Sequence, residues 1–259
     1  RTTLNGEGIQ HQDGHSQILA NTYPNLKSYD PAFAYELVII VREGIRRMYE
    51  QQENIFYYLT AYNENYLMPA MPKTKDIAQK IVAGGYLLSS TKKTSESEIH
   101  LLGSGSIMQQ VLNARDLLEE KGFAVSVWSI TSYNELLRDA EQCERENRLH
   151  PFAKAVTPYI EKLFKTTSGS YVAASDYMKI FANSIAPWMP GQFTALGTDG
   201  YGLSESRADL REYFEISPDY ICHAALVGLY KLGELDAAQL KIHMKDLKID
   251  PDKTNPMHH

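Results

Sequence analysis

The sequence predicts an α/β fold: a mostly parallel sheet with helices on both faces, preceded by the end of a second α/β domain. Short apolar runs alternate along the chain with segments whose apolar residues recur every three or four positions. Because parallel strands are joined through helices that cover both faces of their sheet, this alternation favours a doubly covered sheet. A polar run at 89–97 interrupts the pattern and indicates a break between two units.

The first unit is predicted to end on a helix followed by a strand. Asp30 is suited to cap this helix and Pro31 to begin it, and an apolar stripe carries the helix to about Glu50. The apolar and aromatic run 55–59 predicts a strand that is buried on both faces. Helix followed by buried strand is half of an α/β repeat, so we assign residues 1–72 to the end of a larger α/β domain.

Residues 73–97 are predicted to connect the two units. Pro69 and Pro72 break regular structure just before this segment, and its last part, 89–97, has no core-forming residues. We therefore expect an interdomain connection with a solvated loop near its end.

The second unit, residues 98–259, alternates strands and helices and finishes with helices alone. Its strands are predicted from apolar runs at 99–102, 124–130, 171–174 and 193–196. Its helices are predicted from capping residues, apolar stripes and terminating Gly or Pro residues: from Ser106 to Gly122, from Tyr133 to Arg148, from Ser175 to before Pro187, after Ser206, from Ser217 to Gly233, and after Asp236.

Composition excludes several classes of protein. The chain has 259 residues, enough for one large domain or two modest ones, and a formal net charge of -6. A nucleic-acid-binding protein would need clustered Lys and Arg. No apolar run approaches the roughly 20 residues that span a bilayer, and no signal-peptide pattern opens the chain. The two cysteines, Cys143 and Cys222, lack CxxC spacing and predict reduced thiols in the cytoplasm.

The opening loop contains the side chains that are most suited to catalysis. Residues 5–16 read NGEGIQHQDGHS and combine glycines, acids and histidines with few apolar side chains. Glycine permits close backbone approach, and histidine titrates near neutral pH, so this pattern suits an active-site loop in a chain that starts within a larger enzyme. It also fits a polar surface loop. Because the first ~25 residues are polar and Gly-rich, we expect them to be poorly ordered, or held only by packing contacts, in the fragment.

The run 5–16 resembles the G-E-G-x-Q-H-x-D-G-H-S segment of the homodimeric, bacterial-type decarboxylating component of the pyruvate dehydrogenase complex, a transketolase-like thiamine diphosphate enzyme family. The resemblance extends along essentially the whole chain, to Pro256. Further matching motifs follow in order: YDPA at 29–32, NENY at 63–66, MPAMP at 68–72, LLGSGS at 101–106, SDYMK at 175–179, GTDGYG at 197–202 and SR at 206–207.

The resemblance implies a fragment of a larger enzyme. Residues 1–72 would be the end of the pyrimidine-side thiamine-binding domain, and residues 98–259 a transketolase-like C-terminal domain. The intact homodimer would decarboxylate pyruvate and reductively acetylate the lipoyl group of the acyltransferase component, whereas the fragment alone would be inactive. Two alternatives stay open: a transketolase-type two-carbon transfer enzyme, and a non-catalytic α/β dimerisation module.

The resemblance also implies candidate catalytic residues. It places Glu7 and His11 on the substrate side of the active centre, with His15 as the next candidate. Imidazole can donate to a substrate carbonyl oxygen and move protons near pH 7. At Gln17 the chain departs from relatives that have a third histidine there, so we give this position no role.

The ligands of thiamine diphosphate and Mg²⁺ are expected upstream of Arg1. The family holds them with a GDG segment followed by Asn residues, and the sequence contains no such pair. The glutamate that activates the aminopyrimidine ring is also expected upstream, so we expect the fragment alone to hold no cofactor. Four further histidines have no metal-ligand spacing, which argues against a metal site: His100, His150, His223 and His243.

Three polar motifs allow a structural or a functional interpretation. The turn 103–106 lacks the full spacing of a phosphate-binding loop, and we favour a tight strand-to-helix turn. For the Gly-rich loop 198–202 we favour a structural role, in which Asp199 and Arg207 satisfy backbone groups or each other. The motif 63–66 follows a strand end, so it fits a site facing the cofactor domain or a polar exit from the strand equally well.

Overall fold

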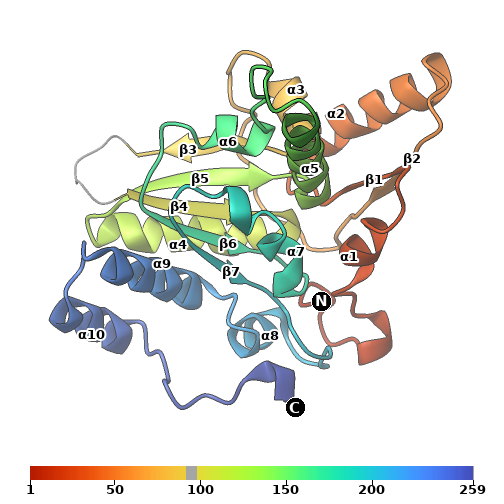
Figure 1. Ribbon diagram of the computed structural model, residues 1–259. Helices are drawn as coiled ribbons and strands as arrows, with labels where there is room; N and C mark the ends of the chain where they lie inside the picture. Colours follow the sequence, from red (N-terminus) through yellow and green to blue (C-terminus); the bar gives the residue numbers. More distant parts are fainter. Residues whose placement is uncertain (92–97, 259) are drawn as a thin grey trace.

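The computed structural model describes residues 1–91 and 98–258, and a five-stranded sheet forms its centre (Figure 1). The strand order is β3-β5-β4-β6-β7; β3 is antiparallel to β5, and the other pairs are parallel. The mostly parallel sheet predicted from the sequence is therefore confirmed. The strands are β3 (Gly85–Ser90), β4 (Glu98–Gly103), β5 (Ala124–Ile130), β6 (Ser170–Ala174) and β7 (Gln192–Leu196).

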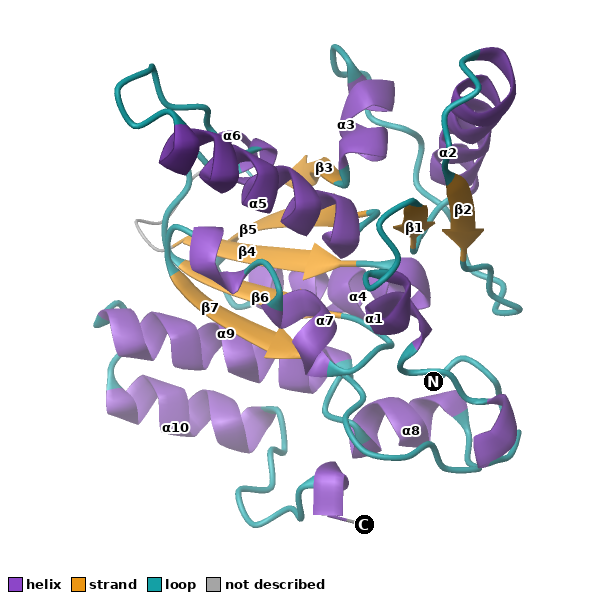
Figure 2. Cartoon of the chain, turned by 45° about the vertical axis from the view of Figure 1, so that its right-hand side comes forward, coloured by secondary structure: helices purple, strands orange, loops and turns teal. Residues whose placement is uncertain are grey.

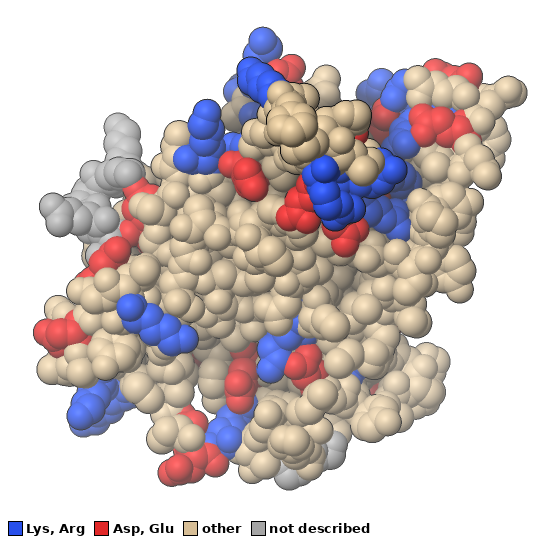
Figure 3. Space-filling view, viewed as in Figure 1, with Lys and Arg blue, Asp and Glu red and all other residues tan. Residues whose placement is uncertain are grey.

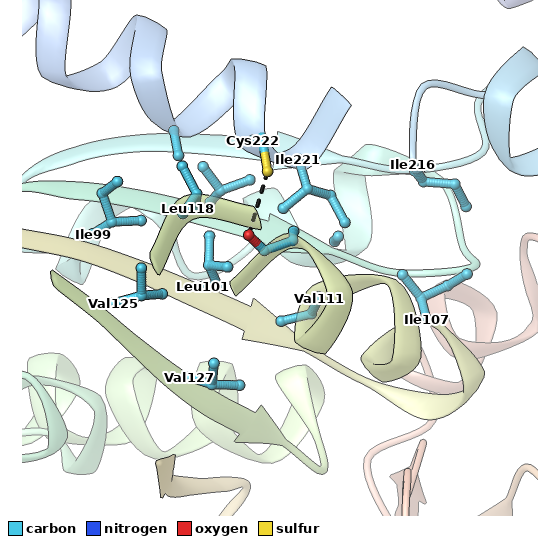
Figure 4. Close-up of a cluster of buried hydrophobic side chains, with 14 of the residues drawn as sticks. Ile99, Leu101, Ile107, Val111, Leu118, Val125, Val127, Ile216, Ile221 and Cys222 are labelled. Atoms are coloured by element: carbon cyan, nitrogen blue, oxygen red, sulfur yellow. Dashed lines mark hydrogen bonds between the residues drawn. The ribbon is translucent and has the colours of Figure 1, made fainter. Parts of the chain in front are cut away.

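Helices cover both faces of this sheet (Figure 2). Leu101 of β4 points to a core shared with α4 and α9, whereas its neighbour Leu102 packs into a second core with α5, α6 and α7. Figure 4 shows the first core, in which the Cys222 thiol donates to the Ala114 carbonyl at 3.3 Å. The helices are α4 (Met108–Glu120), α5 (Tyr133–Leu149), α6 (Tyr159–Leu163), α7 (Lys179–Asn183), α8 (Arg207–Tyr213), α9 (Pro218–Leu232) and α10 (Ala237–Asp246).

Most helices and strands predicted for residues 98–259 are confirmed, with ends within one or two residues of the predicted ones. The prediction for Ser175 was wrong, because α7 begins at Lys179 and Pro187 lies inside the short turn η4 (Ala186–Trp188). Ser206 caps α8 as predicted, since its hydroxyl accepts the Asp209 amide at 3.2 Å. The other 3-10 turns are η1 (Ile9–His11), η3 (Gly105–Ile107) and η5 (Pro256–His258).

A smaller unit precedes the sheet. It contains α1 (Ser16–Ala20), β1 (Leu26–Tyr29), α2 (Ala34–Ile45) with a π-helical continuation η2 (Arg46–Glu50), and β2 (Phe56–Leu59). The sequence did not indicate β1, which pairs in parallel with β2. β2 is not buried on both faces as predicted, because Phe56 is 47% exposed and the other three residues are half-buried.

The predicted start of α2 was also wrong. The helix begins at Ala34, and its first turn is capped by the Glu36 carboxylate, which accepts the amides of Ala32 and Phe33 at 2.7 and 3.0 Å. Asp30 does not cap this helix, because its carboxylate is engaged elsewhere.

The predicted connection contains regular structure. Within 73–97 the chain forms α3 (Ile77–Ala83) and then β3, which pairs with β5 at the edge of the sheet. The apolar run in β3 is short, but its Tyr86 is fully buried, which explains why this segment forms a strand of the sheet. Much of the predicted solvated loop, residues 92–97, lies outside the described residues. No helix in the described ranges is long and apolar enough to cross a membrane.

Candidate functional site

A cavity of about 410 Å³ lies beside the opening loop. His11, Gln12 and Asp13 of that loop line one side, residues 58–63 at and after the end of β2 line another, and Tyr177 reaches it from beyond β6. The carboxyl ends of parallel strands are where α/β folds usually bind ligands. Of the described cavities, we consider this one the candidate site because it gathers imidazole, hydroxyl, amide and carboxylate groups.

A larger open groove, about 910 Å³, runs between α2 with η2 and α3. Arg42, Glu43 and Arg46 line it together with aliphatic side chains. It contains none of the residues predicted to be catalytic, and neither β-strand of the small unit ends in it, so size alone does not make it the candidate site.

The structure separates the three predicted catalytic residues. His11 lines the cavity and is exposed to solvent. Glu7 and His15 lie on the same loop outside the cavity lining; Nδ1 of His15 is 3.0 Å from the Arg1 guanidinium, so it accepts from Arg1. The Glu7 carbonyl accepts from the Gln12 side chain at 3.2 Å. The catalytic roles of all three residues stay predictions.

A buried carboxylate, Asp176, anchors residues 1–3, which lead into the opening loop. It is 1% exposed and accepts from the Thr2 amide at 2.9 Å, the Thr2 hydroxyl at 2.7 Å and the Thr3 hydroxyl at 2.9 Å. The main-chain nitrogen of Arg1 lies 2.8 Å away, and the Thr3 hydroxyl also contacts the Ser106 hydroxyl at 2.6 Å. The prediction that packing alone holds this segment was therefore wrong, and its poor order in the isolated fragment stays a prediction.

The Gly-rich loop after β7 holds the other side of the opening loop. The Glu205 carbonyl accepts the Gly6 amide at 3.0 Å, and the Leu203 carbonyl accepts from the Gln12 side chain. Arg207 donates to the Thr3 carbonyl at 2.7 Å.

The structural role predicted for this Gly-rich loop is confirmed. Asp199 accepts the Lys179 amide at 2.8 Å and pairs with the Lys179 ammonium at 3.0 Å. Since Arg207 is engaged with the opening loop, Asp199 and Arg207 satisfy other groups rather than each other.

A second buried carboxylate, Asp30, ties the cavity wall to the main sheet. It accepts from the hydroxyls of Thr60 at 2.6 Å, Ser104 at 2.7 Å and Tyr62. Burial raises the pKa of Asp30, and these three hydroxyl donors oppose the rise. Gly105 has φ +50°, and a Cβ there would lie 2.7 Å from the Asp30 carboxylate. The turn 103–106 is therefore a packing turn, as predicted, although Ser106 does not begin its helix.

The motif 63–66 divides between two roles. Asn63 lines the cavity, whereas Glu64 accepts from the buried Arg211 guanidinium at 3.0 Å. Arg211 in turn lies 3.4 Å from the Thr2 hydroxyl, so Glu64 supports the start of the opening loop rather than facing a ligand.

Sequence reasoning missed the residues that frame the cavity. Asp176 and Tyr177 received no role, and Asp30 was taken for a helix cap. Both acids follow closely after parallel strands, Asp30 directly after β1 and Asp176 two residues after β6. Position at the carboxyl end of a strand is the signal that points to such residues.

The donors around the cavity do not fit a metal-bound diphosphate. Across residues 1–91 and 98–258, no group of three His, Cys, Asp or Glu side chains is arranged to hold a metal ion. The cavity is lined by hydroxyls, amides and one imidazole, together with the guanidinium of Arg1 and the carboxylate of Asp13. Such groups suit hydrogen bonding to a small organic molecule.

Comparison with protein families divides the chain in two. Residues 1–69 match the model of the pyruvate dehydrogenase E1 component middle domain, and residues 84–217 match the transketolase-like TK C-terminal domain.

Curated relatives match over nearly the whole chain. The pyruvate dehydrogenase E1 component of Pseudomonas aeruginosa is 46% identical over 259 residues, which is 99% of this chain and 29% of that protein. The Escherichia coli K12 protein is 45% identical over the same shares, and that of Mycolicibacterium smegmatis is 41% identical over 96% and 27%. The chain thus spans less than a third of these relatives.

Solved structures show the same fold. A transketolase mutant from Pichia stipitis has a TM-score of 0.60 at 16% identity, covering 91% of this chain and 30% of that one. Transketolase from Campylobacter jejuni has a TM-score of 0.58 at 21% identity, covering 89% and 30%.

Proposed function

Because this chain belongs to the transketolase-like family through its C-terminal domain, we propose that it is part of a pyruvate dehydrogenase E1 component. The complete enzyme would decarboxylate pyruvate and pass the acetyl group to the lipoyl group of an acyltransferase component. Relatives of that name, 41–46% identical over nearly the whole chain, support this activity. One observation connects this activity to a site on the chain: His11, on the opening loop, lines the cavity.

We propose His11 as a proton donor or hydrogen-bond donor to the carbonyl oxygen of the substrate. Its side chain is exposed at the cavity, and hydrogen bonds hold the loop that carries it: Gly6 donates to the Glu205 carbonyl, and the Gly14 carbonyl accepts from the Met178 amide. A fixed donor at the position where charge develops is what catalysis of this kind needs. Glu7 and His15 remain secondary candidates on the same loop.

The ligands of thiamine diphosphate and Mg²⁺ would lie in the remainder of the longer protein. In the same proposal, residues 1–72 are the end of the pyrimidine-side domain, residues 73–97 are the connection, and residues 98–259 are the C-terminal domain. The two family matches, 1–69 and 84–217, support this order.

An uncharged face supports a homodimer. Segments 14–26 and 180–198 contain no Lys, Arg, Asp or Glu, and they bring α1 and α7 side by side. Leu19 is 61% exposed and Ile180 is 60% exposed, and Figure 3 shows a broad area without charge in the middle of this view. Large uncharged surfaces with exposed apolar side chains commonly mark protein contacts. We propose a second copy of the longer protein as the partner on this face.

We also place the protein in the cytoplasm. Cys143 and Cys222 are buried free thiols, as expected for a reducing compartment.

The substitution His11→Ala in the complete enzyme tests the proposed role. Turnover of pyruvate should fall roughly 10²- to 10⁴-fold, because one positioned donor contributes that much to rate. Affinity for thiamine diphosphate and the melting temperature should stay close to those of the parent. The control is His150→Ala, which changes an exposed histidine at the end of α5. Near-normal turnover in His11→Ala would remove this histidine from the active site.

This chain alone should be inactive and should bind no thiamine diphosphate, because the proposed ligands lie elsewhere. Isothermal titration calorimetry with cofactor and Mg²⁺ measures this directly. Micromolar binding would show that the chain holds the cofactor by itself and would contradict the proposed division of the site.

The two alternatives have less support. The sequence identity to the solved transketolases is 15–21%, whereas the identity to the pyruvate dehydrogenase relatives is 41–46%. If the complete enzyme is active with pyruvate and inactive with sugar phosphates, it is not a transketolase. Activity with neither would favour the non-catalytic module.

A further inference from the structure

Residues 250–258, which we call the tail, are held near the end of α8 by the side chain of Lys253. The ammonium of Lys253 donates to the Tyr213 carbonyl at 2.6 Å and lies 3.3 Å from the Glu215 carboxylate. It also lies 5.0 Å from the centre of the Tyr220 ring and 5.7 Å from that of Tyr213. A charge-assisted hydrogen bond, an ion pair and two aromatic faces therefore converge on a single cation.

Beyond this anchor the tail packs on the Gly-rich loop. Gly200 has φ +89°, and a Cβ at this position would lie 2.7 Å from the Pro256 carbonyl oxygen and 3.4 Å from Cα of Met257. Only glycine allows so close an approach of two backbones. A small cavity of about 160 Å³, bordered by Lys179 and Lys253, remains between the tail and the loop.

The opposite side of the same loop supports the candidate site. The Gly200 carbonyl accepts from the Arg1 guanidinium, and the Leu203 carbonyl accepts from the Gln12 side chain. A Cβ at Gly202 would collide with the Gln12 side chain. Residues 199–203, which we call the middle segment, are thus held between the tail and the opening loop. Gln12 directly follows His11, so a shift of this segment reaches the cavity.

We propose that Lys253 is a positioning residue for the candidate site. By fixing the tail against the middle segment, it keeps Gln12 in place and so holds His11 at the cavity. The mechanical link stands on the contacts of this chain alone; its importance for catalysis rests on the proposed function. Lys253 itself touches neither His11 nor the cavity lining.

Hydrogen exchange of this chain, followed by mass spectrometry, tests the mechanical link. Lys253→Met keeps much of the alkyl stem and removes the ammonium. Peptides from the tail, the middle segment and residues 6–15 should all exchange faster, by about tenfold or more, because a charged hydrogen bond is lost from a locally cooperative unit. Lys253→Arg should restore most of the protection. Lys245→Met, which changes an exposed lysine of α10, is the control and should leave these peptides unchanged.

Faster exchange confined to the tail would overturn the proposal, because the tail would then hold only itself. If Lys253→Met fails to fold, Gly200→Ala probes the same link from the other side, since its Cβ would displace the tail. Faster exchange at residues 6–15 in that variant supports the link, and unchanged exchange there contradicts it.

In the complete enzyme the same variants separate positioning from simple stability. Lys253→Met should lower kcat for pyruvate several-fold with little change in cofactor affinity, and Lys253→Arg should recover it. Unchanged kcat despite faster exchange at 6–15 would overturn the positioning role. If His11→Ala keeps normal turnover, the proposed function fails independently, and the hydrogen-exchange result still decides the mechanical link.

Discussion

Buried carboxylates that collect several donors organise this molecule at the scale of single residues. Glu36 shows the pattern most fully. It accepts the amides of Ala32 and Phe33 at 2.7 and 3.0 Å, the Tyr86 hydroxyl at 2.7 Å and the Ser129 hydroxyl at 2.6 Å. Burial raises the pKa of Glu36, and the four donors oppose that rise. One side chain thereby joins the start of α2 to β3 and β5.

Replacing Glu36 by Ala should be among the most destabilising single changes in the chain. It leaves four buried donors without their acceptor, and we expect a loss of about 3–5 kcal/mol in the free energy of unfolding. Glu36→Gln should cost less, because the hydroxyls of Tyr86 and Ser129 can turn to accept from an amide. Urea unfolding followed by circular dichroism measures the difference.

The matched control for Glu36 is Glu43→Ala. Glu43 pairs with Arg46 at 2.6 Å on the outer part of the same helix, where an ion pair contributes little. We expect its loss to change the free energy of unfolding by less than about 1 kcal/mol. Equal losses at the two positions would show that Glu36 is not the organising acceptor.

At the scale of elements, helix caps also tie the two units together. Ser132 caps α5 by accepting the Glu135 amide at 3.0 Å, and its hydroxyl donates to the Ser28 carbonyl of β1 at 2.6 Å. The side chain of Asn134, two residues on, also reaches Ser28, through a contact of 2.6 Å with its hydroxyl. The start of α5 is therefore one of the points where the small unit is hydrogen-bonded to the large one.

Ser132→Ala should lower the free energy of unfolding by about 2 kcal/mol, through the lost cap and the buried Ser28 carbonyl left without its donor. Ser206→Ala, the control, removes a cap of α8 that is more exposed, and should cost about 1 kcal/mol or less. Thermal and urea unfolding of the two variants provide the comparison. A larger loss at Ser206 would contradict the bonding role of Ser132.

Elements with strong local signals were predicted well from the sequence. The strand 124–130 and the helix closed by Gly233 match β5 and α9 because their apolar periodicity, caps and terminators are local. β1 was missed, since its sequence LKSY has no continuous apolar run. It is a strand because it pairs with β2 and packs against α5, which are contacts distant in sequence.

The same distinction applies to the candidate site. The opening loop was found from its composition, and His11 does line a cavity. The acids that hold the cavity together, Asp30 and Asp176, were not found, because their partners come from segments that only the fold brings together.

At the scale of the whole molecule, two histidines in the outer helices link stability to pH. His223 lies on α9 and His243 on α10, and Nδ1 of each is buried without a hydrogen-bond partner among the described residues. Burial lowers the pKa of His223, opposed by the Glu215 charge. Burial and Lys121 lower the pKa of His243, opposed by Asp246. The folded state therefore favours both imidazoles in the neutral form.

The chain should consequently lose stability as the pH falls from 7.5 to 5.5. A histidine whose pKa is lowered by folding binds protons more readily when unfolded, so its stabilising contribution is complete above the ordinary pKa of about 6.5. That contribution is lost as the pH falls through this value toward the lower pKa of the folded state. The double variant His223→Gln with His243→Gln should show a smaller decrease in urea midpoint across this range, whereas the exposed His150→Gln should behave like the parent. A decrease as large in the double variant as in the parent would assign the pH dependence to other groups.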